Sequence, residues 1–122
     1  MDVLNEKGNL TKLNNQTIRE AVELWLENEN EAIKLYGHIS EWDTSEVTDM
    51  KELFKDWVFF NDNISKWNVS SVTDMSDMFE YAESFNQDIG SWDVSKVLNM
   101  EGMFDNAIEF NQNICKWDVS NV

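Results

Sequence analysis

The acidic and amide side chains that could carry chemistry in this sequence fall into two columns with a spacing of 25 residues. The first column is Asp43, Asn68, Asp93 and Asp118, and the second is Asp49, Asp74 and Asn99. Carboxylates stacked at a strand spacing of roughly 4.8 Å could hold calcium. The same residue types also accept backbone N–H bonds at turns and helix starts. Calcium-binding rolls are dense in glycine, and this chain has 4 glycines, so we favour structural capping and expect no metal and no cofactor.

Catalytic chemistry has little support in the sequence. His38 is the only histidine, which rules out a multi-histidine metal site, and no nucleophile motif accompanies it. It follows Gly37 at a predicted helix end, where positive charge is favourable. Cys115 is the only cysteine, and a reactive thiol would need a more basic neighbourhood than Lys116 alone provides. We therefore predict that the protein is not an enzyme.

The same period of 25 residues runs through the apolar positions. Its columns include Trp42, Trp67, Trp92 and Trp117; Ile39, Ile64, Ile89 and Ile114; Met50, Met75 and Met100; Phe54, Phe79 and Phe104; and Phe60, Phe85 and Phe110. Methionine clusters can suggest a soft-metal site and tryptophans a ligand platform, but apolar columns matched to a repeat are typical of its core. Asparagine follows the last phenylalanine column, at Asn61, Asn86 and Asn111, and we expect buried amides that tie neighbouring coils together.

Each repeat changes its local pattern part-way along. The stretch "ISKWNVS" alternates in the manner of a strand, and "SVTDMSDMFEYA" places apolar residues at helical spacing. One short strand and one short helix cannot bury an apolar face alone, but they can when stacked on neighbours. The sequence therefore predicts an α/β repeat: a right-handed β/α, leucine-rich-repeat-like solenoid with a parallel sheet on one side.

The first third of the chain departs from the repeat and predicts a helical cap. The stretch "TIREAVELWLENENEAIKLYG" begins with a capping-box pattern, Thr17 to Glu20, and Gly37 follows a second short helix predicted at residues 31–36. We expect residues 1–37 to form an N-terminal helical cap and residues 38–122 to form a solenoid of three full repeats and a partial fourth. Trp25 is expected to pack near Trp57, which replaces an alanine of the later repeats.

Charge excludes two classes of partner. The formal net charge is −15, from 24 acidic and 9 basic side chains. Nucleic-acid binding requires a basic surface, and so does electrostatic docking on anionic lipid. No apolar stretch is long enough to span a bilayer, and the N-terminal sequence lacks the apolar run of a signal peptide, so we expect no membrane insertion.

The repeat "FNQDIGSWDVSKVLNMEGMF" resembles the BspA-like leucine-rich-repeat surface proteins, and the resemblance covers Ile39 to Val122. It implies a surface-exposed, protein-binding or adhesion-type module with no catalytic motif, located at the cell surface or outside the cell. It also implies that such repeats occur in long arrays.

These observations favour a non-catalytic interaction module with a protein partner. The predicted partner face is the strand-face column beside the aspartates; its residues are Glu41, Asp43, Lys66, Asn68, Ser91, Asp93, Lys116 and Asp118. The alternatives are a calcium-stabilised acidic module and a self-associating structural fragment of a longer array.

The last repeat ends in "ICKWDVSNV", which predicts an exposed apolar edge formed by Ile114, Trp117 and Val119. Exposed strand edges are templates for pairing. We therefore predict that a homodimer could form through this C-terminal edge.

Overall fold

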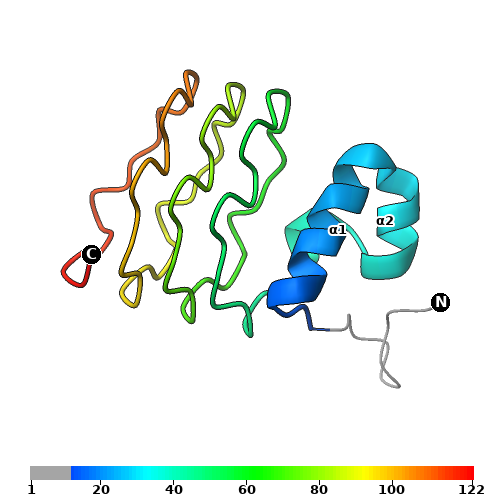
Figure 1. Ribbon diagram of the computed structural model, residues 1–122, viewed down its shortest axis with the longest axis horizontal. Coiled ribbons are helices and arrows are strands. Elements are labelled where there is room, and N and C mark those ends of the chain that lie inside the picture. Colours follow the sequence, from blue (N-terminus) through cyan, green and yellow to red (C-terminus); the bar gives the residue numbers. More distant parts are fainter. Residues whose placement is uncertain (1–11) are drawn as a thin grey trace.

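The computed structural model describes residues 12–122, which form a row of stacked chain turns covered at one end by two helices (Figure 1). The helices are α1 (Asn15–Glu27) and α2 (Glu29–Tyr36), and a single 3-10 turn, η1 (Ile39–Glu41), follows them. Residues 38–62, 63–87 and 88–112 are called units 1, 2 and 3, and residues 113–122 begin a fourth. The first eleven residues of the predicted cap lie outside the described residues.

Helix α1 is capped three residues earlier than predicted. Its N-cap is Asn14, whose side chain accepts hydrogen bonds from the N–H groups of Gln16 and Thr17, while the Thr17 hydroxyl accepts one from the Asn14 N–H. The predicted box between Thr17 and Glu20 is therefore wrong, because Thr17 already serves as the third residue of the box that Asn14 opens.

Asn28 joins the two helices. Its N–H donates to Leu24 at the end of α1, and its side chain accepts from the Glu31 N–H at the start of α2. Helix α2 thus begins two residues earlier than predicted. Gly37 ends it at a φ of 79°, which confirms the predicted glycine stop. The buried face of α1 is formed by Ile18, Ala21, Val22 and Trp25.

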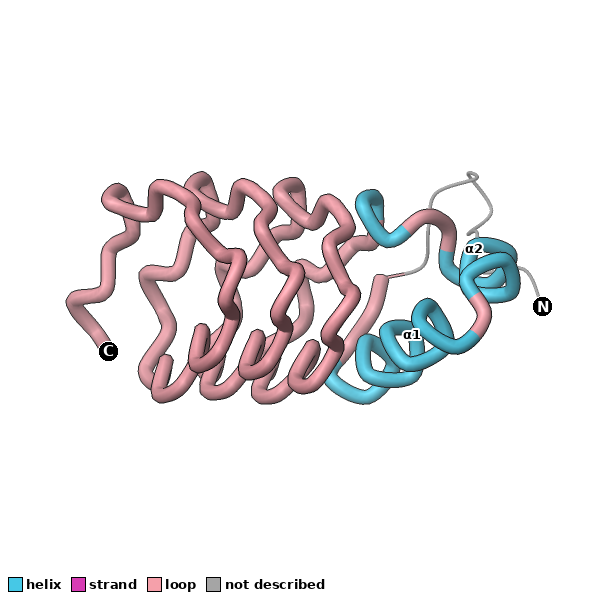
Figure 2. Tube along the Cα trace, turned by 90° about the horizontal axis from the view of Figure 1, so that it is seen from above, coloured by secondary structure: helices cyan, strands magenta, loops and turns pink. Residues whose placement is uncertain are grey.

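The predicted β/α solenoid with a parallel sheet is wrong. Within residues 12–122 the units contain no strand and no α-helix, and apart from η1 they are coloured as loop in Figure 2. Two isolated parallel bridges, Asp49 with Asp74 and Asp74 with Asn99, are the only ladder pairs in this part of the chain. The expected strand at "ISKWNVS" and the expected helix at "SVTDMSDMFEYA" are instead turns and irregular segments.

The direction of the backbone hydrogen bonds explains why the expected helix does not form. Alternate N–H groups of unit 2 donate to carbonyls 24 residues further along the chain, as Met75 does to Asn99 and Phe79 to Met103, each at 2.9 Å. Of the N–H groups between them, Met78 donates three residues back to Met75 at 3.2 Å, and Ser76 donates to the Asp74 side chain at 2.9 Å. No N–H remains for the bond four residues back that an α-helix needs.

This alternation forces some residues into the left-handed region of φ. Asp77 (φ 54°) and Tyr81 (φ 58°) in unit 2 match Glu52 and Asp56 in unit 1. Left-handed φ values at four-residue intervals are incompatible with either a strand or a helix. The apolar spacing of "MSDMF" therefore reflects burial within a stacked turn.

The core is a set of aromatic stacks that run through the units. Phe79 lies between Phe54 and Phe104, with ring centroids 5.6 and 5.7 Å apart and the planes within 9°. Trp92 stacks on Trp117 at 6.5 Å. The expectation that the repeated tryptophans, phenylalanines and methionines form the core agrees with their burial, which is lost only toward the last unit.

Two kinds of side chain connect successive units through the main chain. The indole N–H of Trp67 donates to the Ile39 carbonyl at 2.8 Å, and Trp92 repeats this bond to Ile64 at 3.1 Å. The Asn61 side chain accepts from the Asn86 N–H at 2.8 Å. The asparagine column thus ties units together as predicted, although its members are exposed and not buried as expected.

Replacing Trp25 with alanine is expected to lower the free energy of unfolding by about 3–5 kcal/mol. The Trp25 side chain is 2% exposed, its ring packs edge-on against Trp42 at 5.9 Å, and its indole N–H donates to Asp62. Urea denaturation followed by far-ultraviolet circular dichroism measures the change. Leu26→Ala, at a neighbouring side chain that is 37% exposed, is the control and should cost far less. A loss below about 1 kcal/mol for Trp25→Ala would mean that α1 does not anchor the stack.

Candidate functional site: a pocket between the helices and unit 1

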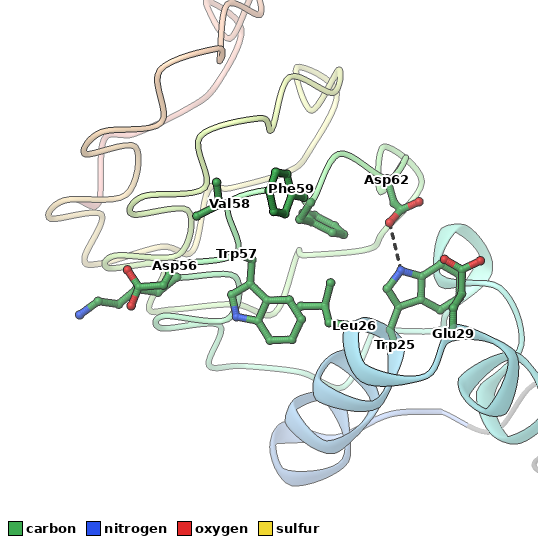
Figure 3. Close-up of a pocket in the computed structure, with 10 residues that line it drawn as sticks. Trp25, Leu26, Glu29, Asp56, Trp57, Val58, Phe59 and Asp62 are labelled. Carbon is green, nitrogen blue, oxygen red and sulfur yellow. Dashed lines mark hydrogen bonds between the residues drawn. The ribbon is translucent and has the colours of Figure 1, made fainter.

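A pocket of approximately 510 Å³ lies where the helices meet unit 1 (Figure 3). Its lining comes from the end of α1, the start of α2 and the loop that closes unit 1. The lining residues are Trp25, Leu26, Glu29, Lys55, Asp56, Trp57, Val58, Phe59, Phe60 and Asp62. The pocket therefore combines aromatic and aliphatic surface with four charged side chains.

The pocket residues of unit 1 depart from the columns of units 2 and 3. Trp57 stands where the later units have alanine, and Phe59 stands where they have serine and glutamate. Asp62 stands where both later units have glutamine. Phe59 is 91% exposed and contributes little to the core. The repeat therefore does not require these residues, and their clustering at one pocket is a feature of this surface alone.

Trp25 forms the inner wall of the pocket and is held from three sides. Its indole N–H donates to the Asp62 carboxylate at 3.0 Å. Its ring packs edge-on against His38 at 5.0 Å and against Trp42 at 5.9 Å. Trp57 lines the same pocket, as Figure 3 shows, so the prediction that the two tryptophans lie near each other agrees with this geometry.

The charge around the pocket is predominantly negative. The Lys55 ammonium lies 3.2 Å from Glu80 and 3.3 Å from Glu52, and the hydrogen bonds to Glu80 and then Glu52 raise the pKa of Lys55 above its ordinary value. Lys55 is therefore already paired. Among residues 12–122, no ion pair involves the other three charged lining residues, which are Glu29, Asp56 and Asp62.

The predicted partner face lies elsewhere. Glu41, Lys66, Ser91 and Lys116 are all exposed, and Lys66 pairs with Glu41 at 3.3 Å. Ser91 and Lys116 border a polar depression of approximately 330 Å³ between unit 3 and the start of the fourth unit. None of these four residues lines the pocket beside Trp25.

The aspartate columns make turns. Asp43, Asn68 and Asp93 each accept the N–H of the serine two residues on at 3.0 Å and its hydroxyl at 2.6 Å. Asp118 accepts the Ser120 N–H in the same way. The second column, Asp49, Asp74 and Asn99, also accepts N–H groups two residues on. These bonds agree with the capping interpretation, and residues 12–122 contain no group of three or more acidic, histidine or cysteine side chains placed to hold a metal ion.

The pKa values of these carboxyls follow from the same bonds. Hydrogen bonds from the Ser95 hydroxyl and N–H lower the pKa of Asp93 below its ordinary value. Burial of Asp43 acts to raise its pKa, but the bonds from Ser45 outweigh this and lower it. The carboxylates are thus stabilised in their charged form by the main chain of their own turns.

His38 belongs to a third column that the sequence analysis missed. Its Nδ1 accepts a hydrogen bond from the Ser40 N–H at 3.2 Å. Asn63, Asp88 and Asn113 accept the N–H two residues on at the same place in later units. The interpretation of His38 as a positive charge at a helix end is therefore replaced by a role as a turn acceptor. Its spacing of 25 residues from Asn63 was the signal for this role.

The predicted self-association edge lies at the far end of the stack. Ile114, Trp117 and Val119 border an apolar depression of approximately 530 Å³ together with Met100 and Phe104. Phe79 of unit 2 is fully buried, whereas its equivalent Phe104 is only partly covered.

Within the described residues, the main chain at this end presents unpaired N–H donors. The N–H groups of Met100, Gly102, Phe104 and Asn106 have no hydrogen-bond acceptor among residues 12–122, although their equivalents in units 1 and 2 donate to the next unit. Two copies meeting about a two-fold axis would set donors against donors. A homodimer at this end stays a prediction, and it would have to depend on the apolar side chains.

A model of the family described as "Mycoplasma protein of unknown function, DUF285" matches residues 22–122. The chain belongs to this family. No curated protein and no solved structure matches it. The resemblance to BspA-like leucine-rich-repeat surface proteins is therefore wrong, since the matching family is DUF285 and the units lack the strand of a leucine-rich repeat.

The DUF285 match begins inside α1 and includes every residue that lines the pocket. Within the part of the chain that the structure describes, no helix combines the length and the apolar character needed to cross a bilayer.

Replacing Ser95 with alanine is expected to raise the pKa of Asp93 toward 3.8, because the hydroxyl bond that lowers it is lost. A carboxyl whose pKa falls on folding stabilises the fold above its ordinary pKa, and this stability is lost as pH falls through the folded value. The stability difference between the wild type and Ser95→Ala should therefore shrink as pH falls below 3.8. NMR titration of Asp93 measures the shift, with Ser91→Ala as the control. An unchanged Asp93 titration in Ser95→Ala would contradict this account.

Proposed function

We propose that this DUF285 chain is a non-catalytic protein-interaction module that binds a polypeptide segment in the pocket between the helices and unit 1. The observation that carries the proposal is the clustering of Trp57, Phe59 and Asp62, each of which departs from its repeat column. Residues that are the same at equivalent positions of successive units are explained by the stacking of those units. Trp57 packs partly against the core and Asp62 accepts a hydrogen bond from Trp25, so contact with the helices accounts for part of their departure. Phe59 leaves its column and stays 91% exposed, and a bound partner supplies an explanation for it.

The physical character of the pocket supports a polypeptide ligand. Phe59 at 91% exposure, with Leu26 and Val58 at 37% each, leaves apolar surface facing water beside a concave wall. Exposed apolar patches with a polar rim are typical of interaction sites, and buried aromatic anchors dominate binding energy there. A volume of approximately 510 Å³ can hold one or two side chains of a bound segment.

Charge supports the choice of a protein over other macromolecules. A net charge of −15 opposes association with phosphate backbones and with anionic lipid headgroups. The exposed column of Glu41, Lys66, Ser91 and Lys116 offers a second, polar surface. The pocket is the stronger candidate because it has apolar surface to bury.

The proposal is tested with a phage library of random twelve-residue peptides selected against the immobilised chain. The pocket variant is Trp57→Ala combined with Phe59→Ser, which installs the residues that unit 2 carries at these columns. Selected peptides are expected to lose about thirtyfold in affinity for this variant, because two aromatic contacts disappear. Affinity is measured by isothermal titration calorimetry.

The controls separate a lost site from a lost fold. Phe59→Ser alone changes an exposed side chain and should reduce affinity without changing the melting temperature. Lys66→Ala on the polar column is the matched surface control and should leave affinity unchanged. Peptides that bind the double variant as tightly as the wild type would contradict the proposal, and loss of binding in Lys66→Ala would move the site to the polar column.

A further inference from the structure

We infer that the segment bound in this pocket carries an arginine beside its apolar anchor, and that the arginine pairs with Asp56. This inference depends on the proposed function and names the chemistry of the partner. Its basis is the distribution of charge around an aromatic surface.

The pocket rim has unpaired negative charge on both sides of the aromatic residues. In the view of Figure 3, Glu29 and Asp62 lie on the Trp25 side and Asp56 lies on the Trp57 side. Lys55, the only basic lining residue, is paired with Glu80 and Glu52 outside the pocket. Lys55 therefore does not neutralise the rim.

The three carboxylates are not equally available to a ligand. Asp62 already accepts the Trp25 indole N–H, and Glu29 lies in the first turn of α2, where the helix dipole stabilises its charge. The Asp56 side chain is exposed, and it has no hydrogen bond or ion pair with any other residue in the described range of 12–122. Asp56 is also adjacent in sequence to Trp57. It is therefore the carboxylate best placed to meet a cation that lies over the aromatic surface.

Arginine suits this combination better than other side chains. Its planar guanidinium stacks on aromatic faces, binds a carboxylate through two parallel hydrogen bonds and is weakly hydrated. A purely apolar ligand would cover the rim and leave its carboxylates desolvated without a partner, which is unfavourable. An acidic segment would be repelled. The net charge of −15 would also accelerate the encounter with a basic segment.

The other units supply a substitution that removes the charge without disturbing the backbone. Asp56 has a φ of 67°, and Asn106 occupies the same column in unit 3 with a φ of 57°. Asp56→Asn therefore keeps a residue that this left-handed position accepts. Asp93→Asn is the matched control, because it removes one charge far from the pocket at a column where unit 2 has Asn68.

The experiment uses soluble peptides from the library selection and compares each arginine with citrulline, which has the same shape and no charge. Peptides that bind the pocket are expected to share an arginine next to an apolar residue. The change to citrulline should weaken binding to the wild type about tenfold, from the combined loss of an ion pair and a stacked cation. In Asp56→Asn the same change should have a much smaller effect, while Asp93→Asn should behave as the wild type.

The outcomes distinguish this inference from the proposed function. One outcome is a set of selected peptides that need Trp57 and Phe59 and yet contain no basic residue or tolerate citrulline. Such peptides would rule out the arginine inference and leave the proposed interaction function standing. An equal citrulline effect in the wild type and Asp56→Asn would also overturn the inference, because the cation would then pair elsewhere. If no selected peptide depends on the pocket aromatics, both proposals are wrong.

Discussion

The rest of the structure depends on the row of main-chain hydrogen bonds between neighbouring units. In each row alternate N–H groups donate to carbonyls 24 residues further along the chain, at 2.8–3.0 Å from Met50, Glu52, Phe54 and Asp56. Buried polar main-chain groups must find partners, and here a neighbouring unit supplies them where regular secondary structure would do so in other folds. The aromatic stacks follow from this register, because matched backbones place equivalent rings over one another.

The register of the units distinguishes residues that hold the stack together from residues that line the proposed binding pocket. Most side chains in a column have a defined structural role. Trp67 and Trp92 reach a carbonyl of the preceding unit, Asn61 accepts an N–H of the following one, and Asp93 closes its own turn. Substituting such a residue breaks a bond that the stack needs. Phe59 has no such role, and the later units place polar residues there. The proposal that the pocket binds a partner therefore depends on comparing the units with one another.

The sequence alone was sufficient to predict the repeat period, the presence of two helices ahead of the repeats and most of the core residues, because burial is visible in apolar spacing. It was not sufficient for the local backbone, since Asp77 and Tyr81 have left-handed φ values and the bonds that set them run 24 residues along the chain. The pocket was only partly predictable. Trp57 is recognisable as a bulky residue in an alanine column, whereas an aromatic residue next to Phe60 suggests more core. The structure separates these neighbours, since Phe60 is 3% exposed and Phe59 is 91% exposed.

The carboxylates of the chain fall into two groups. Some are bonded within their own turns, and others are free to contact a ligand at the proposed pocket. Carboxylates such as Asp43, Asp74 and Asp93 accept bonds from their own turns, which lowers their pKa values and engages their charge within the fold. Asp56 has no such bond, so its charge is available to a ligand. Asp62 has an intermediate role, because its bond to Trp25 fixes the pocket wall and joins the helical cap to unit 1. A ligand in the pocket would contact both of these parts of the chain, and its binding free energy would therefore also stabilise the contact between them.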